Sequence, residues 1–172
     1  MPDLETLARQ KCEAALQRRL DALPKDIKAL QANLAAKGQF QSGSMLKQVL
    51  AICQASLQNH AETAIAEHQW AVEKALFASH SWVLRLSDQA ERSVRPLYDA
   101  SVQSVTRAAD QISSGNLAPL LVRELEQTLV TVNNDISLAM RAGFAEKSRG
   151  LLRNLPASIL NAISRLFKGG TQ

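Results

Sequence analysis

Aromatic residues, glycine, proline and long apolar runs are all scarce in this sequence. Phenylalanine, tryptophan and tyrosine make up 4% of the 172 residues, beside seven glycines and five prolines. The low aromatic content argues against a deep, aromatic-lined ligand pocket. The longest apolar run, Leu117–Val122, is far shorter than the roughly 18 residues of a membrane-spanning helix. The N-terminal stretch carries acids and no apolar core, so we expect no secretory signal and a cytoplasmic location.

Cysteines and histidines are also few and poorly spaced. The only two cysteines, Cys12 and Cys53, have no CxxC spacing and fall at apolar positions, which predicts buried free thiols. The histidines, His60, His68 and His80, are rotated by about 80° and 120° from one to the next along a helix, so they should not share a face. No zinc motif or nucleophile elbow is present. We therefore expect no metal, no cofactor and no enzymatic activity.

Excess positive charge is confined to the C-terminal end. Residues 141–172 carry six Lys or Arg and one acid, whereas the other 140 residues sum to a net charge of −1. A neutral body with a basic end is consistent with ordinary solubility or with an anionic partner. Nucleic-acid binding favours a basic stripe with interleaved aromatics, which the sequence lacks. Nucleic acid is therefore not an expected partner, whereas an anionic membrane surface is an alternative.

The sequence does contain a long stretch of helical apolar periodicity, from Ser44 to about Ser114. Apolar residues recur in steps of three and four, which returns them to one face of a helix. We expect one long central helical segment, kinked or broken near its single proline, Pro96, with the polar Ala78–Ser81 as a second weak point. A helix of that length cannot bury its apolar stripe alone. The stripe consists of Leu46, Leu50, Cys53, Leu57, Ala61, Ile65, Val72, Leu76, Val83, Leu86, Ala90, Val94, Leu97, Val105, Ala108 and Ile112.

The residues before this stretch predict an N-terminal helical hairpin and a loop, together residues 1–43. The first helix is expected from Asp3, its N-cap, to Leu23, with Pro24 ending or kinking it. A shorter helix should follow to about residue 36, with Gly38 as its C-terminal cap. The glycine- and serine-rich residues 37–44 then form a loop.

A second stop signal, Gly115-Asn116, precedes another helix that we expect from about Ala118 to Ser148. The short turn favours antiparallel packing of the two helices it joins. Residues 44–150 should thus form a long helical hairpin or bundle. The predicted fold is all-α: an elongated antiparallel helical bundle with coiled-coil-like packing.

The third predicted unit is a basic amphipathic helix within residues 151–172, covering about residues 155–168. Its apolar face would contact a membrane or a protein partner, or it would dock on the bundle. The contact residues are predicted to be Ile159, Ile163, Leu166 and Phe167, with Arg165 and Lys168 beside them.

The function most consistent with this pattern is a non-enzymatic assembly or adaptor protein that associates with a protein partner or with copies of itself. The alternative is a peripheral membrane or surface-coating protein anchored by residues 155–168. For association, the sequence singles out two groups: the aromatic cluster beside Ala78–Ser81, and two members of the long stripe. These residues are Trp70, Phe77, Trp82, Leu86 and Val94.

Overall fold

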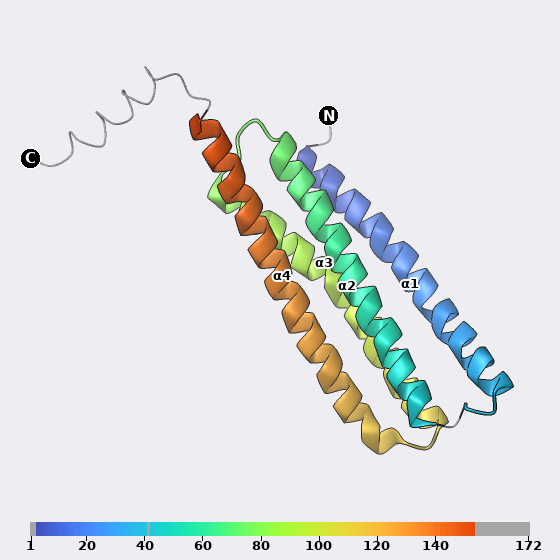
Figure 1. The fold of residues 1–172 in the computed structure, drawn as a ribbon. Coiled ribbons are helices and arrows are strands. Elements are labelled where there is room, and N and C mark those ends of the chain that lie inside the picture. Colours follow the sequence, from blue (N-terminus) through green and yellow to red (C-terminus); the bar gives the residue numbers. More distant parts are fainter. Residues whose placement is uncertain (1–2, 41, 154–172) are drawn as a thin grey trace, which may run out of the picture.

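The computed structural model describes residues 3–40 and 42–153, which form four long helices. These are α1 (Leu4–Ala36), α2 (Gly43–Lys74), α3 (His80–Gln111) and α4 (Ala118–Arg153), with one 3-10 turn, η1 (Gly115–Leu117), before the last. Helices that follow one another in sequence run antiparallel, and the molecule is elongated along them (Figure 1). The described residues contain no strand. The predicted all-α antiparallel bundle is confirmed.

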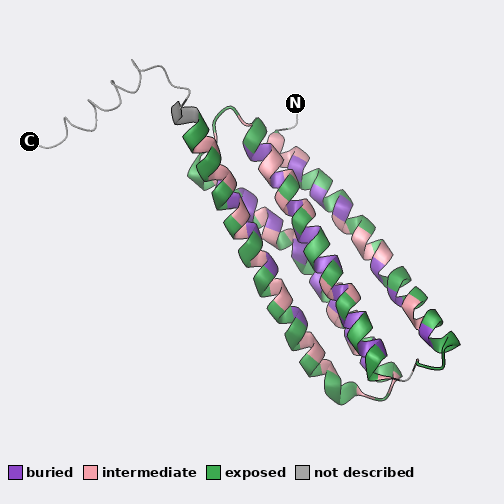
Figure 2. Cartoon of the chain, in the orientation of Figure 1, coloured by how far each residue is buried: buried purple, intermediate pink, exposed green. Residues whose placement is uncertain are grey.

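The four helices are not equivalent, because α2 and α3 form a central pair. Both α1 and α4 pack against this pair, whereas the described parts of α1 and α4 form no comparable interface with each other. Thirteen residues of α2 and eleven of α3 are buried, but only six of α1. Figure 2 shows the consequence, since the outer helices carry long exposed faces. The core is therefore a shared apolar layer on either side of α2 and α3.

The predicted break at Pro24 is wrong, because α1 is one helix of 33 residues with Pro24 inside it. Proline removes one backbone hydrogen bond and is costly within a helix. Here the Pro24 ring lies on the exposed side of α1, where water can reach the freed carbonyl group, while Leu23 and Ile27 are buried against the core. Tertiary packing on both sides of the proline thus holds the helix together.

The ends of α1 follow the predicted capping chemistry. Oδ1 of Asp3 accepts a hydrogen bond from the backbone N–H of Thr6 at 2.6 Å. At the other end, Gly38 has a positive φ of 67°, a conformation that glycine adopts without steric cost. Its N–H donates to the carbonyl of Ala35, and the next N–H donates to that of Leu34. The predicted cap at Gly38 is confirmed.

The expectation of one long segment broken near Pro96 is also wrong. The chain reverses at residues 75–79, and Pro96 lies inside α3 with its ring exposed and with the buried Val94 and Leu97 nearby. The Oγ atom of Ser79 caps α3 by accepting a hydrogen bond from the N–H of Trp82 at 3.2 Å. The reversal lets the two halves of the apolar stripe bury each other. The weak point that the sequence placed at Ala78–Ser81 therefore overlaps the actual break, at Ala78 and Ser79.

A lysine of α4 fastens the end of α2 before this reversal. Nζ of Lys147 donates hydrogen bonds to the carbonyl groups of Val72, Glu73 and Ala75, at 2.8 Å for Glu73. These are carbonyls at the C-terminal end of α2, which have no partners within the helix. A positive charge at this end is also favourable for the helix dipole. Lys147 thus caps the C-terminal end of α2 and links that end to α4.

The start of α4 agrees with the sequence prediction, and its end lies further along the chain. α4 begins at Ala118 with Pro119 in its first turn, after a reversal through Ser113, which has a φ of 55°. It continues to Arg153 rather than ending near Ser148. None of the helices in the described ranges is both long and apolar enough to cross a membrane.

Candidate functional site

The residues predicted to mediate association do not form one surface. Leu86 and Val94 are both 0% exposed and belong to the chain's own core, so neither is available to a partner in the folded protein. Trp70 and Trp82 are half-buried. Only Phe77 is freely exposed, at 88%. Apart from Leu76, the long stripe that suggested a partner is buried or half-buried, because the chain reverses at residues 75–79.

Phe77 and its neighbour Leu76 form an apolar tip at one end of the bundle. Leu76 is 85% exposed, so two large apolar side chains stand side by side in the loop between α2 and α3. We call Leu76 and Phe77, together with the adjoining N-terminus of α1, the end patch. It borders an open groove of about 770 Å³. The residues that line the groove are Asp3, Leu4, Glu5, Lys74, Ala75, Leu76, Phe77, Trp82 and Arg85.

Both tryptophans are engaged within the chain. Nε1 of Trp82 donates to Oε2 of Glu5 at 2.9 Å, which ties α3 to the first turn of α1. The ring of Trp70 has the ammonium group of Lys11 4.1 Å from its centroid, within range of a cation–π interaction. Lys11 also pairs with Glu67 at 2.9 Å. The two tryptophans therefore hold α1 on the central pair.

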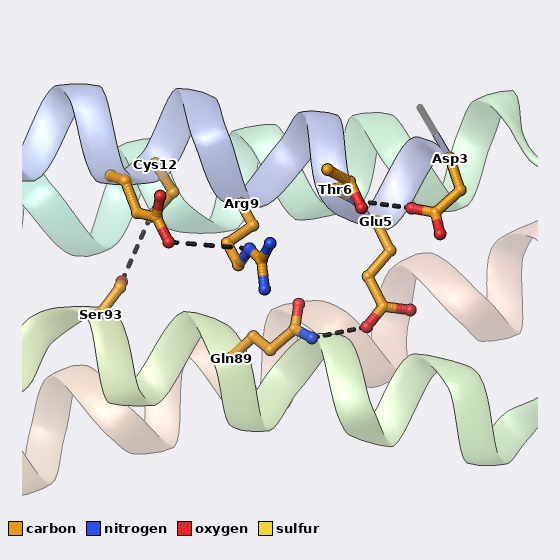
Figure 3. A network of polar contacts seen from close by, with 8 residues as sticks. Asp3, Glu5, Thr6, Arg9, Cys12, Gln89 and Ser93 are labelled. Atoms are coloured by element: carbon orange, nitrogen blue, oxygen red, sulfur yellow. Dashed lines mark hydrogen bonds and ion pairs between the residues drawn. The ribbon is translucent and has the colours of Figure 1, made fainter. Parts of the chain in front are cut away.

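A polar seam joins α1 and α3, and sequence reasoning missed it. The two helices run in the same direction, and Figure 3 shows their facing side chains near the N-terminus of α1. Nε2 of Gln89 donates to Oε1 of Glu5 at 2.6 Å. About two turns further along α1, the thiol of Cys12 donates to Oγ of Ser93 at 3.3 Å. Cysteine and serine at core positions are the sequence signal for this seam, but the partners lie about 80 residues apart.

Ser93 is also hydrogen-bonded to His60. A serine beside a histidine can be a nucleophile with its general base, so the direction of these hydrogen bonds matters. Nε2 of His60 lies 3.1 Å from the Ser93 carbonyl and 3.2 Å from its Oγ atom. A carbonyl oxygen only accepts, so Nε2 carries the proton and cannot act as the base for Ser93. The hydroxyl proton of Ser93 is donated to the carbonyl of Ala90. Burial also raises the pKa of the Cys12 thiol. This arrangement is a structural hydrogen-bond chain, not an activated nucleophile.

Both His60 and His68 are buried, although about 80° of rotation around α2 separates them. α2 has neighbours on several sides, so a wide arc of its surface is buried. Nδ1 of His68 donates to the carbonyl of Ala64 at 2.8 Å. Burial lowers the pKa of both imidazoles, although hydrogen bonds to carbonyl groups oppose the effect. The folded protein thus holds two neutral histidines.

Because these two histidines are buried, we expect the free energy of unfolding to decrease below about pH 6.5. Their pKa values are depressed in the folded chain, so between the ordinary value of 6.5 and the folded value the unfolded chain binds more protons. Stability is fully present above pH 6.5 and is lost as the pH falls toward the folded pKa, by up to about 1.4 kcal/mol per pH unit for each histidine. Urea unfolding at about pH 7.5 and 5.5 measures this slope. His68→Gln should reduce it; a slope equal to that of the wild type would contradict the explanation.

The two cysteines are free and buried, as predicted. Burial raises the pKa of the Cys53 thiol to about 11. Across the described part of the chain, His, Cys, Asp and Glu form no group of three or more suited to a metal ion. The predicted contact residues of the basic amphipathic helix, Ile159 to Lys168, lie outside the described residues.

Comparison of the chain with protein-family models, curated proteins and solved structures found no match.

Proposed function

We propose that this chain is a non-enzymatic assembly or adaptor protein of the cytoplasm, which acts by associating with copies of itself or with a protein partner. The observation that carries the proposal is the end patch, where Leu76 and Phe77 are 85% and 88% exposed. A loop that only reverses the chain would be built from small polar residues. Neighbouring large apolar side chains on a loop are instead typical of a contact surface.

The charges around the end patch favour a second copy as its first partner. The groove beside Phe77 is lined by two acids, Asp3 and Glu5, and by two bases, Lys74 and Arg85. A two-fold symmetric contact brings the same patch of two copies together, so acids of one copy can face bases of the other. The apolar tip would be buried at the centre, with the charges at the rim. The coiled-coil-like packing and oligomer expected from the sequence belong to this proposal.

Phe77→Ser tests the proposal. Burial of a phenylalanine contributes about 1.5–3 kcal/mol, and a two-fold contact buries it twice, so self-association should weaken by roughly 100-fold or more. Sedimentation velocity over a range of concentrations measures this effect. Leu138→Ser is the matched control, because Leu138 is 69% exposed on α4, away from the end patch. A wild-type chain that stays monomeric throughout, or an equal effect of Leu138→Ser, would overturn self-association.

Vesicle flotation of the same proteins distinguishes self-association from the alternative of membrane binding. The described part of α4 ends at the same end of the bundle as the α2–α3 loop (Figure 1). Flotation with anionic vesicles should compare the full chain, Phe77→Ser and a chain ending at Asn154. Flotation that is lost on truncation, in a protein that does not self-associate, would favour the peripheral membrane function.

A further inference from the structure

The longest apolar run of the sequence, Leu117–Val122, is incompletely covered in the folded molecule. It extends from the last residue of η1 into the first turns of α4, and none of its residues is fully buried. Leu117 is 37% exposed and Leu120 is 59% exposed. Large apolar side chains that gather on a protein surface are typical of a contact site.

An open groove of about 460 Å³ lies beside this run, between the first turns of α2 and α4. The buried Leu46 and Leu50 of α2 form its base, and Leu117, Leu120 and Leu121 stand on the side of α4. We call this surface the leucine groove. It lies at the opposite end of the bundle from the loop between α2 and α3 (Figure 1), so it is separate from the end patch.

The charges at the leucine groove favour a second copy of the chain as its occupant. Lys47 borders the groove on α2 and Glu124 borders it on α4, and both side chains are exposed. Within residues 3–40 and 42–153, neither of them forms an ion pair. A two-fold axis through the groove would place Lys47 of one copy opposite Glu124 of the other, and the reverse. The surface is thus complementary to itself in charge.

We propose that the leucine groove binds a second copy of this chain in a two-fold symmetric contact. Leu117 and Leu120 of each copy pack over the groove of the other, where they are shielded from water. The leucines form the apolar centre of the contact, and the Lys47–Glu124 pairs lie at its rim. This contact uses no residue of the end patch, so it does not require Phe77.

Together with the end patch, the leucine groove gives the assembly an open form. A single two-fold contact joins two copies and then leaves no surface of that kind unused. Two such contacts at opposite ends of an elongated molecule instead link copies alternately into an unbranched chain. This consequence rests on the self-association proposed for the end patch, whereas the leucine contact itself does not.

Sedimentation velocity over a range of concentrations tests the leucine contact in wild type, Phe77→Ser, Leu120→Ser and the double variant. The wild type should exceed the mass of two copies, each single variant should stop at two, and the double variant should stay monomeric. Adding Leu120→Ser to Phe77→Ser should weaken the remaining association at least about 30-fold, because the contact buries the exposed part of Leu120 in both copies. Val130→Ser added to Phe77→Ser is the matched control, since Val130 is 60% exposed on α4 outside the groove.

The two single variants distinguish failure of the leucine contact from failure of the end patch. A monomeric Phe77→Ser protein beside a dimeric Leu120→Ser protein would overturn the leucine contact and leave the end patch intact. The reverse result would support the leucine contact and refute the end patch. Monomers from both single variants would mean that the end patch of one copy binds the groove of the next, which would overturn the two-fold contact. A monomeric wild type would overturn both proposals.

A charge exchange tests the two-fold arrangement directly. In the Phe77→Ser protein, Lys47→Glu should weaken the dimer about tenfold, because acids of the two copies would then face each other. Adding Glu124→Lys should restore the affinity, since each new base again faces an acid of the other copy. Failure of the second substitution to restore the dimer would refute the proposed pairing of Lys47 with Glu124.

Discussion

Replacing Leu86 with alanine is expected to lower the free energy of unfolding by about 2–5 kcal/mol, because the change leaves a cavity in a tightly packed core. Leu86 is among the largest fully buried side chains and lies on α3, one of the two central helices. Leu86→Glu should prevent stable folding altogether, since the core offers a buried carboxylate no partner. Urea unfolding followed by circular dichroism measures both effects.

The control for Leu86 is Leu84→Ala, two residues earlier on the same helix. Leu84 is 41% exposed, and its truncation should cost much less. Sedimentation of folded Leu86→Ala should give the same mass as the wild type at equal concentration. A fully stable Leu86→Ala protein with an altered mass would instead place this residue at an intermolecular contact.

Lys147→Met is expected to destabilise the chain by about 2 kcal/mol. The substitution keeps most of the side-chain length but removes a charge-assisted donor that serves the carbonyl groups of Val72, Glu73 and Ala75. It also removes a cation from the C-terminal end of α2, where the helix dipole favours positive charge. Thermal and urea unfolding give the total effect, and hydrogen exchange should show faster opening at the last turn of α2.

The matched control is Lys74→Met, which removes a positive charge from the same turn. Lys74 is exposed and is the last residue of α2, so its loss should cost only a few tenths of a kcal/mol. If the two variants were equally stable, charge alone would explain the effect and the three hydrogen bonds of Lys147 would contribute little.

Local chemistry was sufficient to predict several boundaries of the fold. Gly38 ends α1 because its positive φ suits glycine, and Pro119 stands in the first turn of α4, where no backbone donor is needed. The buried free thiols of Cys12 and Cys53 followed from their apolar positions. These features depend on a few neighbouring residues, so sequence reasoning could reach them.

The features that sequence reasoning missed depend on contacts between distant residues. Pro24 and Pro96 are tolerated within helices because their rings face solvent while adjacent residues are buried, which only the packed structure reveals. The chain breaks at residues 75–79 and not at Pro96, because a reversal there lets the two halves of the apolar stripe bury each other. The seam between α1 and α3 pairs Cys12 with Ser93 across 81 positions, and helical periodicity carries no information about such pairs.

The central position of α2 and α3 also orders the assembly of the chain. Neither outer helix can bury its apolar face until the hairpin of α2 and α3 exists, because the described residues of each outer helix pack on that hairpin and form no comparable interface with the other outer helix. The hairpin is joined by a short loop, so its formation requires little loss of chain entropy. Both outer helices pack onto this hairpin, and α1 and α4 can do so in either order. A substitution that displaces one outer helix therefore leaves the other outer helix packed on α2 and α3 as a three-helix unit.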